Sequence, residues 1–229
     1  MSDFVNDDPK YQASDPLTPG AVPEGVIISS DTYREQRIPA GQTRTRKWPV
    51  LHYGYVPTID LDKWRFEVKG LVDNPLSFTW DEFQQLPRVK VFSDFHCVTR
   101  WSRLGNVWEG VSIRELMNRA GVQAEAKYVI AEGYDSGWTT NMPLADADAE
   151  DVLLADIHDG EPINADHGGP LRLVVPRLYA WKSAKWLRSL TLVAQDTPGY
   201  WEQAGYHMHG DPWVQNAANP DGERFRDDM

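Results

Sequence analysis

The stretch that decides the fold is Phe92-Ser93-Asp94-Phe95-His96-Cys97-Val98-Thr99-Arg100-Trp101-Ser102-Arg103, which holds the only cysteine of the 229-residue chain. Apolar or small residues alternate from Val89 to Cys97, as expected for a strand with one buried face. This pattern places the sulfur inside the protein, near a strand end. Read alone, a lone cysteine is more often a small buried hydrophobe than a reactive group. Arg100 and Arg103 favour the other reading, because nearby positive charge lowers the pKa of a thiol and makes it a metal ligand or nucleophile.

Composition indicates a globular protein that is long enough to be an enzyme. Hydrophobic residues make up 41% of the chain and charged residues 25%, with ten tryptophans and nine tyrosines. The formal net charge is -11, which disfavours a nucleic-acid partner because the surface would repel phosphates. An anionic ligand would therefore need a local positive pocket inside an acidic shell.

The sequence also predicts where the protein resides. The first ten residues lack a basic region followed by an apolar run, and no segment approaches the roughly 18 apolar residues of a membrane span. One cysteine without a secretory signal agrees with a reducing compartment. We therefore expect a cytoplasmic protein with no membrane span.

Residue patterns divide the chain into three parts and favour an α+β fold. Residues 1–47 are polar and rich in proline, which predicts an extended arm that wraps the body or stays partly mobile. Residues 48–213 form the predicted domain, and residues 214–229 a polar tail. The domain shows more strand patterns than helix patterns, with hairpin turns and no regular alternation of strands and helices. Capping boxes at Thr79–Glu82 and Ser112–Glu115 predict two helix starts.

Four further windows could form a binding site. Residues 47–57 gather rings, a histidine and a glycine between prolines, which suits either a wall for a flat ligand or a turn covering the core. The loop 134–141 suits a pocket lip. Arg172 lies in an apolar strand after a glycine turn and needs a partner. The segment from Tyr179 to Trp186 could hold a phosphate with its lysines and serine, or could equally be a solvated basic turn.

Other signals are weak or absent. His207 and His209 alternate without a third ligand, so an aromatic cap is favoured over a metal site there. The sequence contains no GxGxxG, P-loop, CxxC, CxxCH or HExxH motif. These absences leave a haem or a Rossmann-type nucleotide site unsupported.

Taken together, the strand-end cysteine, the Gly-Gly-Pro-Leu-Arg strand, the Trp-Lys-Ser-Ala-Lys loop and the Gly-Tyr-Trp-Glu-x-x-Gly-Tyr segment resemble the molybdopterin-dependent oxidoreductases of the sulfite oxidase superfamily. The resemblance runs from about Trp48 to Trp213. It is closest to the small haem-free bacterial members, which include the catalytic subunit of the methionine sulfoxide reductase. It implies the sulfite oxidase catalytic-domain fold, with mixed sheets and few short helices.

The resemblance also implies a cofactor, molybdenum-molybdopterin, and a set of site residues. Cys97 would be the metal ligand and, with Arg100 and Trp138, catalytic. Trp138 stands where sulfite oxidases carry an active-site tyrosine, and an indole offers only an N–H. The residues expected to bind the cofactor are His52, Tyr53, Gly54, Cys97, Thr99, Gly133, His167, Arg172, Ser183, Ala184 and Lys185.

The leading interpretation is an enzyme that transfers an oxygen atom to or from a small sulfur- or nitrogen-containing substrate, with an electron-transfer partner still to be identified. Two alternatives stay open. In one, Cys97 is a nucleophile activated by His96 or another histidine that the fold brings near. In the other, the same fold is a binding protein without a cofactor.

Overall fold

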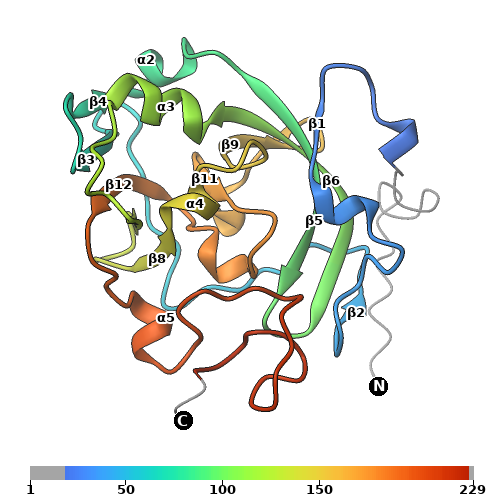
Figure 1. Cartoon of the computed structure of the whole chain (residues 1–229). Coiled ribbons are helices and arrows are strands. Elements are labelled where there is room, and N and C mark those ends of the chain that lie inside the picture. The colour runs from blue at the N-terminus through green and yellow to red at the C-terminus, as the bar shows by residue number, and fades with distance from the viewer. Residues whose placement is uncertain (1–18, 227–229) are drawn as a thin grey trace.

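Two mixed β-sheets carry the fold, as the predicted α+β class requires (Figure 1). The computed structural model describes residues 19–226. The first 18 residues of the predicted arm and the last three of the predicted tail lie outside the described residues. The division into arm, domain and tail stays a prediction.

The larger sheet carries the cysteine. Its strands are β1 (Ile27–Ile28), β2 (Thr43–Arg44), β5 (Val89–Cys97), β6 (Trp101–Ser112), β9 (Leu153–His158), β10 (Glu161–Pro162) and β11 (Arg172–Val174). The order is β1-β5-β6-β9-β10, with β2 added beside β6 and β11 beside β9. Strands β5 and β6 form a hairpin in which Cys97 pairs directly with Trp101.

Strand β5 is buried on both faces, which corrects the expectation of one buried face. Every residue from Val91 to Cys97 is buried. The arm explains the difference, because β1 pairs along the edge of β5 and brings Arg37 over the second face, where it holds the buried carboxylate of Asp94 at 2.6 Å. On the same side, the Trp213 ring lies 5.5 Å from His96. Segments distant in sequence thus cover the face that the alternation left to solvent.

The second sheet has the order β4-β3-β12-β7-β8. Its strands are β3 (Phe66–Gly70), β4 (Leu76–Phe78), β7 (Tyr128–Gly133), β8 (Thr139–Pro143) and β12 (Leu187–Val193). Strand β12 pairs in parallel with β3 and antiparallel with β7, so the C-terminal half of the chain completes a sheet that the N-terminal half begins. The main hydrophobic core includes residues of both sheets and of α3.

Short helices connect the strands. They are α2 (Trp80–Gln84), α3 (Ile113–Ala120), α4 (Leu144–Ala147) and α5 (Tyr200–Gln203), with 3₁₀ turns η1 (Pro19–Ala21), η2 (Ser30–Tyr33), η3 (Ala165–His167) and η4 (Ala180–Lys182). The capping box predicted at Thr79 is present, with Glu82 bonding back to the Thr79 amide. At Ser112 the helix starts as predicted, but the serine side chain makes no capping bond.

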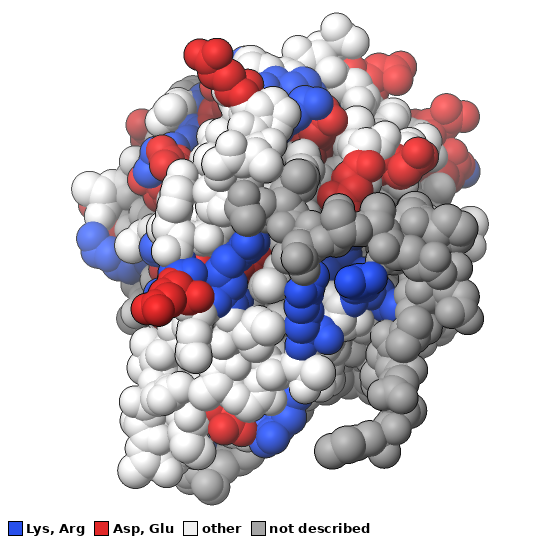
Figure 2. Space-filling view, turned by 90° about the vertical axis from the view of Figure 1, so that its right-hand side faces the viewer, with Lys and Arg blue, Asp and Glu red and all other residues white. Residues whose placement is uncertain are grey.

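Charge is spread unevenly over the surface. On the face shown in Figure 2, Lys and Arg side chains gather across the middle of the view and most Asp and Glu lie above them. Among the described residues, no helix is both long and apolar enough to cross a membrane.

Candidate active site

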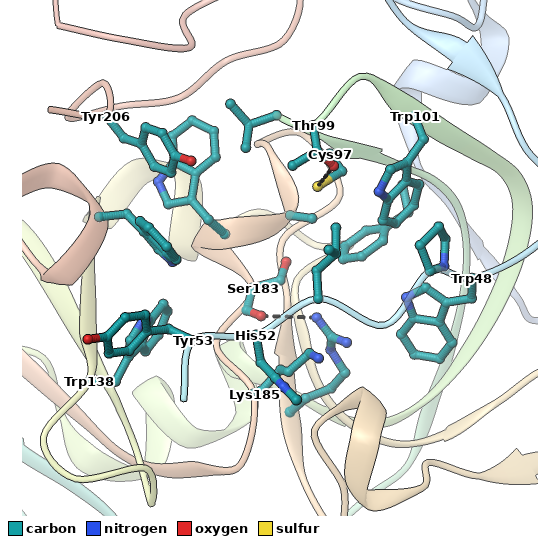
Figure 3. A pocket seen from close by; sticks show the side chains of 18 of the residues that line it. Trp48, His52, Tyr53, Cys97, Thr99, Trp101, Trp138, Ser183, Lys185 and Tyr206 are labelled. Atoms are coloured by element: carbon teal, nitrogen blue, oxygen red, sulfur yellow. Dashed lines mark hydrogen bonds between the residues drawn. The ribbon is translucent and has the colours of Figure 1, made fainter. Parts of the chain in front are cut away.

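One cavity, of about 250 Å³, brings together residues from distant parts of the chain (Figure 3). Its walls come from the loop after Trp48, the β5–β6 turn, the loop before β8, the start of β11, the η4–β12 segment and the chain around α5. Eight of the predicted site residues line it: His52, Tyr53, Cys97, Thr99, Trp138, Arg172, Ser183 and Lys185. In Figure 3, Cys97 and Thr99 lie at one end, His52 and Lys185 at the other, and Ser183 between them.

The sulfur end is buried and only weakly polar. Cys97 is 8% exposed, and the Thr99 hydroxyl donates a hydrogen bond to its sulfur at 3.2 Å. Burial raises the pKa of the Cys97 thiol, against the smaller opposing effects of Thr99, Lys185 and Arg224. The thiol is therefore protonated at neutral pH in the cofactor-free protein. The expectation that neighbouring arginines lower this pKa is wrong.

Neither of those arginines lines the cavity. Arg100 occupies the β5–β6 turn with a φ of 72°, and its guanidinium lies 2.8 Å from Asp221 with about half of the side chain exposed. Arg103 is buried, but it pairs with Asp159 at 2.6 Å and also contacts Asn106. Both positive charges are thus compensated by carboxylates away from Cys97.

The opposite end holds two cations that form no salt bridge with a carboxylate of the described residues, although Asp135 also lines the cavity and its charge, with that of Asp166, acts on Lys185. Arg172 is 2% exposed and donates to the backbone oxygens of His167 at 2.7 Å and Ser183 at 3.0 Å. Lys185 donates to the backbone oxygen of Asp166 at 2.6 Å. These carbonyls satisfy N–H groups but supply no negative charge. The predicted partner of Arg172 is therefore not a carboxylate of residues 19–226.

The pKa values reflect this unpaired charge. Burial lowers the pKa of Arg172 to about 9. Burial, and then the charge of Arg172, lowers the pKa of Lys185 to about 7. The pKa of His52 is also lowered, first by desolvation and then by Lys185. Keeping these buried groups charged costs free energy, and an anion bound in the cavity would offset this cost.

The other predicted cofactor residues lie around the cavity and do not line it. His167 donates from Nε2 to the Trp48 carbonyl at 2.9 Å and stacks on the Trp48 ring at 4.0 Å, so it supports a wall of the cavity. Gly133 packs closely against the backbone of Lys185, because a Cβ added to this glycine would lie 3.0 Å from the Lys185 carbonyl oxygen. Ala184 is fully buried in the main core. Gly54 lies in the exposed loop after Tyr53 with a φ of 73°.

Only one of the two lysines predicted as a cradle reaches the cavity. Lys182 is fully buried and pairs with Glu202 at 2.7 Å. The same carboxylate accepts a bond from the Trp181 indole at 2.9 Å, which fixes that ring in the cavity wall. Lys182 therefore acts in packing, and Lys185 alone supplies lysine charge to the cavity.

Sequence reasoning missed most of the aromatic lining. The cavity walls also include Trp48, Phe95, Trp101, Trp181, Trp186, Trp201 and Tyr206. The high ring content of the chain was the only general signal, because the rings come from segments without a shared pattern. Burial raises the pKa of Tyr206, so its hydroxyl stays protonated at neutral pH.

The two alternating histidines do not form a metal centre. Among residues 19–226, no group of three or more His, Cys, Asp or Glu side chains is placed to hold a metal ion. His209 instead lies between the carboxylates of Asp146 and Glu223, each at 2.9 Å. The neighbouring Tyr206 lines the cavity.

Comparison with known proteins identifies the family. The model of the oxidoreductase molybdopterin-binding domain matches residues 53–201. An uncharacterized oxidoreductase, YuiH, of Bacillus subtilis is 51% identical over 77% of this chain and 89% of its own length. The chain belongs to the molybdopterin-binding oxidoreductases. It is therefore an enzyme, which removes the alternative of a binding protein without a cofactor.

More distant relatives agree with the resemblance to the sulfite oxidase superfamily. A putative protein-methionine-sulfoxide reductase subunit, YedZ1, of Azospira oryzae is 32% identical over 72% of this chain and 64% of its own length. A nitrate reductase of Phaseolus vulgaris is 25% identical, but this chain spans only 23% of it. The sulfane dehydrogenase SoxCD of Paracoccus pantotrophus matches in structure with a TM-score of 0.56 and 26% identity, over 61% of this chain and 40% of that one.

The cavity fits the cofactor of this family. A dithiolene-bound molybdenum needs a soft ligand, and Cys97 is the only described thiol. The pterin carries a phosphate, and the two unpaired cations lie at the opposite end of the cavity from that thiol. A cavity with a sulfur end and a cationic end therefore matches the two ends of one ligand.

Proposed function

We propose that this protein transfers an oxygen atom to or from a small sulfur- or nitrogen-containing substrate at a molybdenum centre whose protein ligand is Cys97. The observation that carries the proposal is the pair of cations without carboxylate partners, Arg172 and Lys185, across one cavity from a single buried thiol. When bound, the cofactor supplies the two-electron redox chemistry. The residues of this chain hold it, orient it and control access.

Cys97 would be the metal ligand. Because burial raises its pKa, the free protein holds a thiol, and binding of the metal releases the proton. The hydrogen bond from Thr99 then meets a thiolate, which accepts more strongly than a thiol. Thr99 thus fixes the direction in which the sulfur presents its lone pairs.

Arg172, Ser183 and Lys185 would hold the phosphate of the pterin. Arg172 cannot move far, because it is buried and its N–H groups hold two backbone oxygens. The Ser183 hydroxyl oxygen accepts the Val175 amide at 2.9 Å, which leaves its own hydrogen available to donate. Burial and the charge of Arg172 lower the pKa of Lys185 in the free protein. A phosphate beside the amine would raise this pKa again, so Lys185 would be fully charged in the complex.

The loop after Trp48 would cover the flat part of the cofactor. His52 and Tyr53 line the cavity from this loop, and the Tyr53 ring lies 4.7 Å from that of Tyr200. His167 supports the same wall through Trp48. Trp138 lines the cavity and would contact the bound ligands, whereas Arg100 lies outside it and would not.

The names of the relatives support the substrate class. They describe a methionine sulfoxide reductase subunit, nitrate reductases and a sulfane dehydrogenase, which act on compounds of sulfur or nitrogen. Enzymes of this kind exchange electrons with another molecule, so we propose an electron-transfer partner. The cytoplasmic location stays a prediction, which fractionation of native cells would test.

The alternative of a cysteine nucleophile finds no activating base next to the thiol, because His52, the histidine that lines the cavity, lies at the end opposite Cys97 (Figure 3). His96 follows the opposite face of β5 and bonds Ser102 at 2.9 Å. Burial lowers the pKa of His96 to about 3, and this residue does not line the cavity. A thiol with a raised pKa and no base beside it is a poor nucleophile.

Elemental analysis tests the proposal. Protein purified from a host that makes the cofactor should contain about one molybdenum per chain. The Cys97→Ser variant should keep its fold and lose turnover, because a hard alkoxide cannot replace the thiolate. Cys97→Ala, measured in parallel, has no ligand atom in its side chain. A difference between the two variants would show whether the serine oxygen binds the metal. Molybdenum-free wild type would refute the proposal, and so would full turnover by Cys97→Ser.

A further inference from the structure

The sulfur end of the cavity has an uncharged, aromatic lining. Cys97 lies in one packed cluster with Val98 and Trp181, against which Trp101, Trp201 and Tyr206 pack. The cations that line the cavity, Arg172 and Lys185, are those assigned above to the cofactor phosphate. No other arginine or lysine of residues 19–226 lines it. The chamber beside the sulfur is therefore built for a ligand without net charge.

The polar groups of this chamber include two without an assigned task, the buried indole N–H of Trp101 and the hydroxyl of Tyr206. The Tyr206 hydroxyl has no hydrogen-bond partner among the described residues, although its ring is well fixed. That ring stacks on Trp201 at 5.1 Å and lies 5.3 Å from Trp181 and 5.5 Å from Phe225. In Figure 3 it reaches from the C-terminal segment into the cavity on the side where Cys97 and Thr99 lie. It is a rigid donor placed beside the reacting end of the site.

We propose, on the basis of the function above, that the Tyr206 hydroxyl donates a hydrogen bond to the oxygen of an uncharged S-oxide or N-oxide substrate held among these rings. For a sulfoxide, the S–O bond breaks, the sulfur keeps an electron pair, and the oxygen leaves as water with two protons. The two electrons come from two molecules of a reduced one-electron carrier, for which a reduced viologen dye serves in the assay, and the two protons come from solvent. Tyr206 keeps its own proton and orients the oxygen.

Two observations favour an uncharged oxide over an oxyanion. Moving an anion into an aromatic chamber without a cation carries a large desolvation cost. The arginine nearest in sequence to the sulfur, Arg100, is held outside by Asp221 at 2.8 Å.

Trp138, at the position where a tyrosine was expected from the resemblance, lies away from Cys97 in Figure 3. Tyr206 thus supplies from the C-terminal segment the hydroxyl that position 138 lacks.

The test uses loaded enzyme of known molybdenum content. Wild type, Tyr206→Phe and the control Tyr33→Phe are compared with methyl phenyl sulfoxide, sulfite and nitrate as substrates. Tyr33 is 66% exposed and lies outside the cavity. We expect kcat/KM for the sulfoxide to fall about a hundredfold in Tyr206→Phe, mainly in kcat, and to be unchanged in Tyr33→Phe. Molybdenum content and melting temperature should be equal in all three.

A second measurement reports binding without turnover. The electron paramagnetic resonance signal of Mo(V) should shift when the sulfoxide is added to wild type, and less so in Tyr206→Phe. Sulfite and nitrate should leave it unchanged. A shift with the anions alone would overturn the role of Tyr206 while leaving the proposed function intact. Equal kcat/KM for the sulfoxide in loaded wild type and loaded Tyr206→Phe would do the same. Wild type without molybdenum would refute the proposed function itself, and this inference with it.

Discussion

Replacing Lys185 with methionine gives a direct test of the cationic end of the cavity. The change removes the charge and keeps most of the length of the side chain. Lys185 bonds no carboxylate, only the Asp166 carbonyl at 2.6 Å. The variant should therefore fold without leaving a buried charge unpaired. What it would lose is the proposed charge-assisted hydrogen bond to the phosphate of the cofactor.

The size of the effect follows from that one bond. A hydrogen bond between charged groups contributes about 1.5–3 kcal/mol, which corresponds to about 10- to 150-fold in affinity. The ratio of molybdenum to protein, followed during dialysis, measures cofactor retention. Lys185→Met should lose molybdenum that much faster than wild type.

The matched control is Lys90→Met, which removes the same charge from a half-exposed surface pair with Glu109. A surface pair contributes little, so this variant should retain the cofactor as wild type does. If Lys185→Met and Lys90→Met keep molybdenum equally well, Lys185 does not hold the phosphate. The assignment of the cationic end would then rest on Arg172 alone.

Two further predictions concern buried charge. Because the pKa of Lys185 falls from 10.5 to about 7 on folding, the unfolded chain binds more protons between these pH values, and the free energy of unfolding of the cofactor-free protein should rise with pH across that window. Urea denaturation should show a smaller slope in Lys185→Met, and an unchanged slope would contradict the burial of this amine. Lys182→Met leaves the fully buried Glu202 carboxylate without its positive partner, and should lower the free energy of unfolding by about 3–5 kcal/mol. The double variant with Glu202→Gln should recover part of this loss in the same assay, and an additive further loss would argue against a direct pair.

Local patterns predicted the elements better than they predicted burial. The strand ending at Cys97, the cap at Thr79 and the strand before Gly133 follow from residue periodicity and capping chemistry, which act over a few neighbours. The burial of both faces of β5 could not be read in this way. It depends on Arg37, some sixty residues earlier, which pairs with Asp94, and on the Trp213 ring beside His96.

The same distinction applies to the site. Residue types marked Cys97, Arg172 and Lys185 as candidates, and the cavity brings the three together. Arg100 was predicted from its nearness in sequence, but the positive φ of the turn carries it outward to Asp221. Tyr206 had no comparable signal, because it reaches the cavity only through the fold of the C-terminal segment. Its position depends on packing against Trp181 and Trp201, which no local pattern records.

Both ends of the cavity are attached to one sheet. Cys97 ends β5 and Arg172 begins β11, and these strands are joined through β6 and β9 by continuous hydrogen-bonded pairing. The guanidinium of Arg172 lies 5.3 Å from the ring of Phe95, two residues before the thiol in β5. A rigid sheet therefore sets the separation between the proposed metal ligand, Cys97, and the proposed phosphate-binding cation, Arg172. Loops contribute the other walls, so variation in substrate should be found in the segments around Trp48 and Tyr206, while the geometry that grips the cofactor stays fixed.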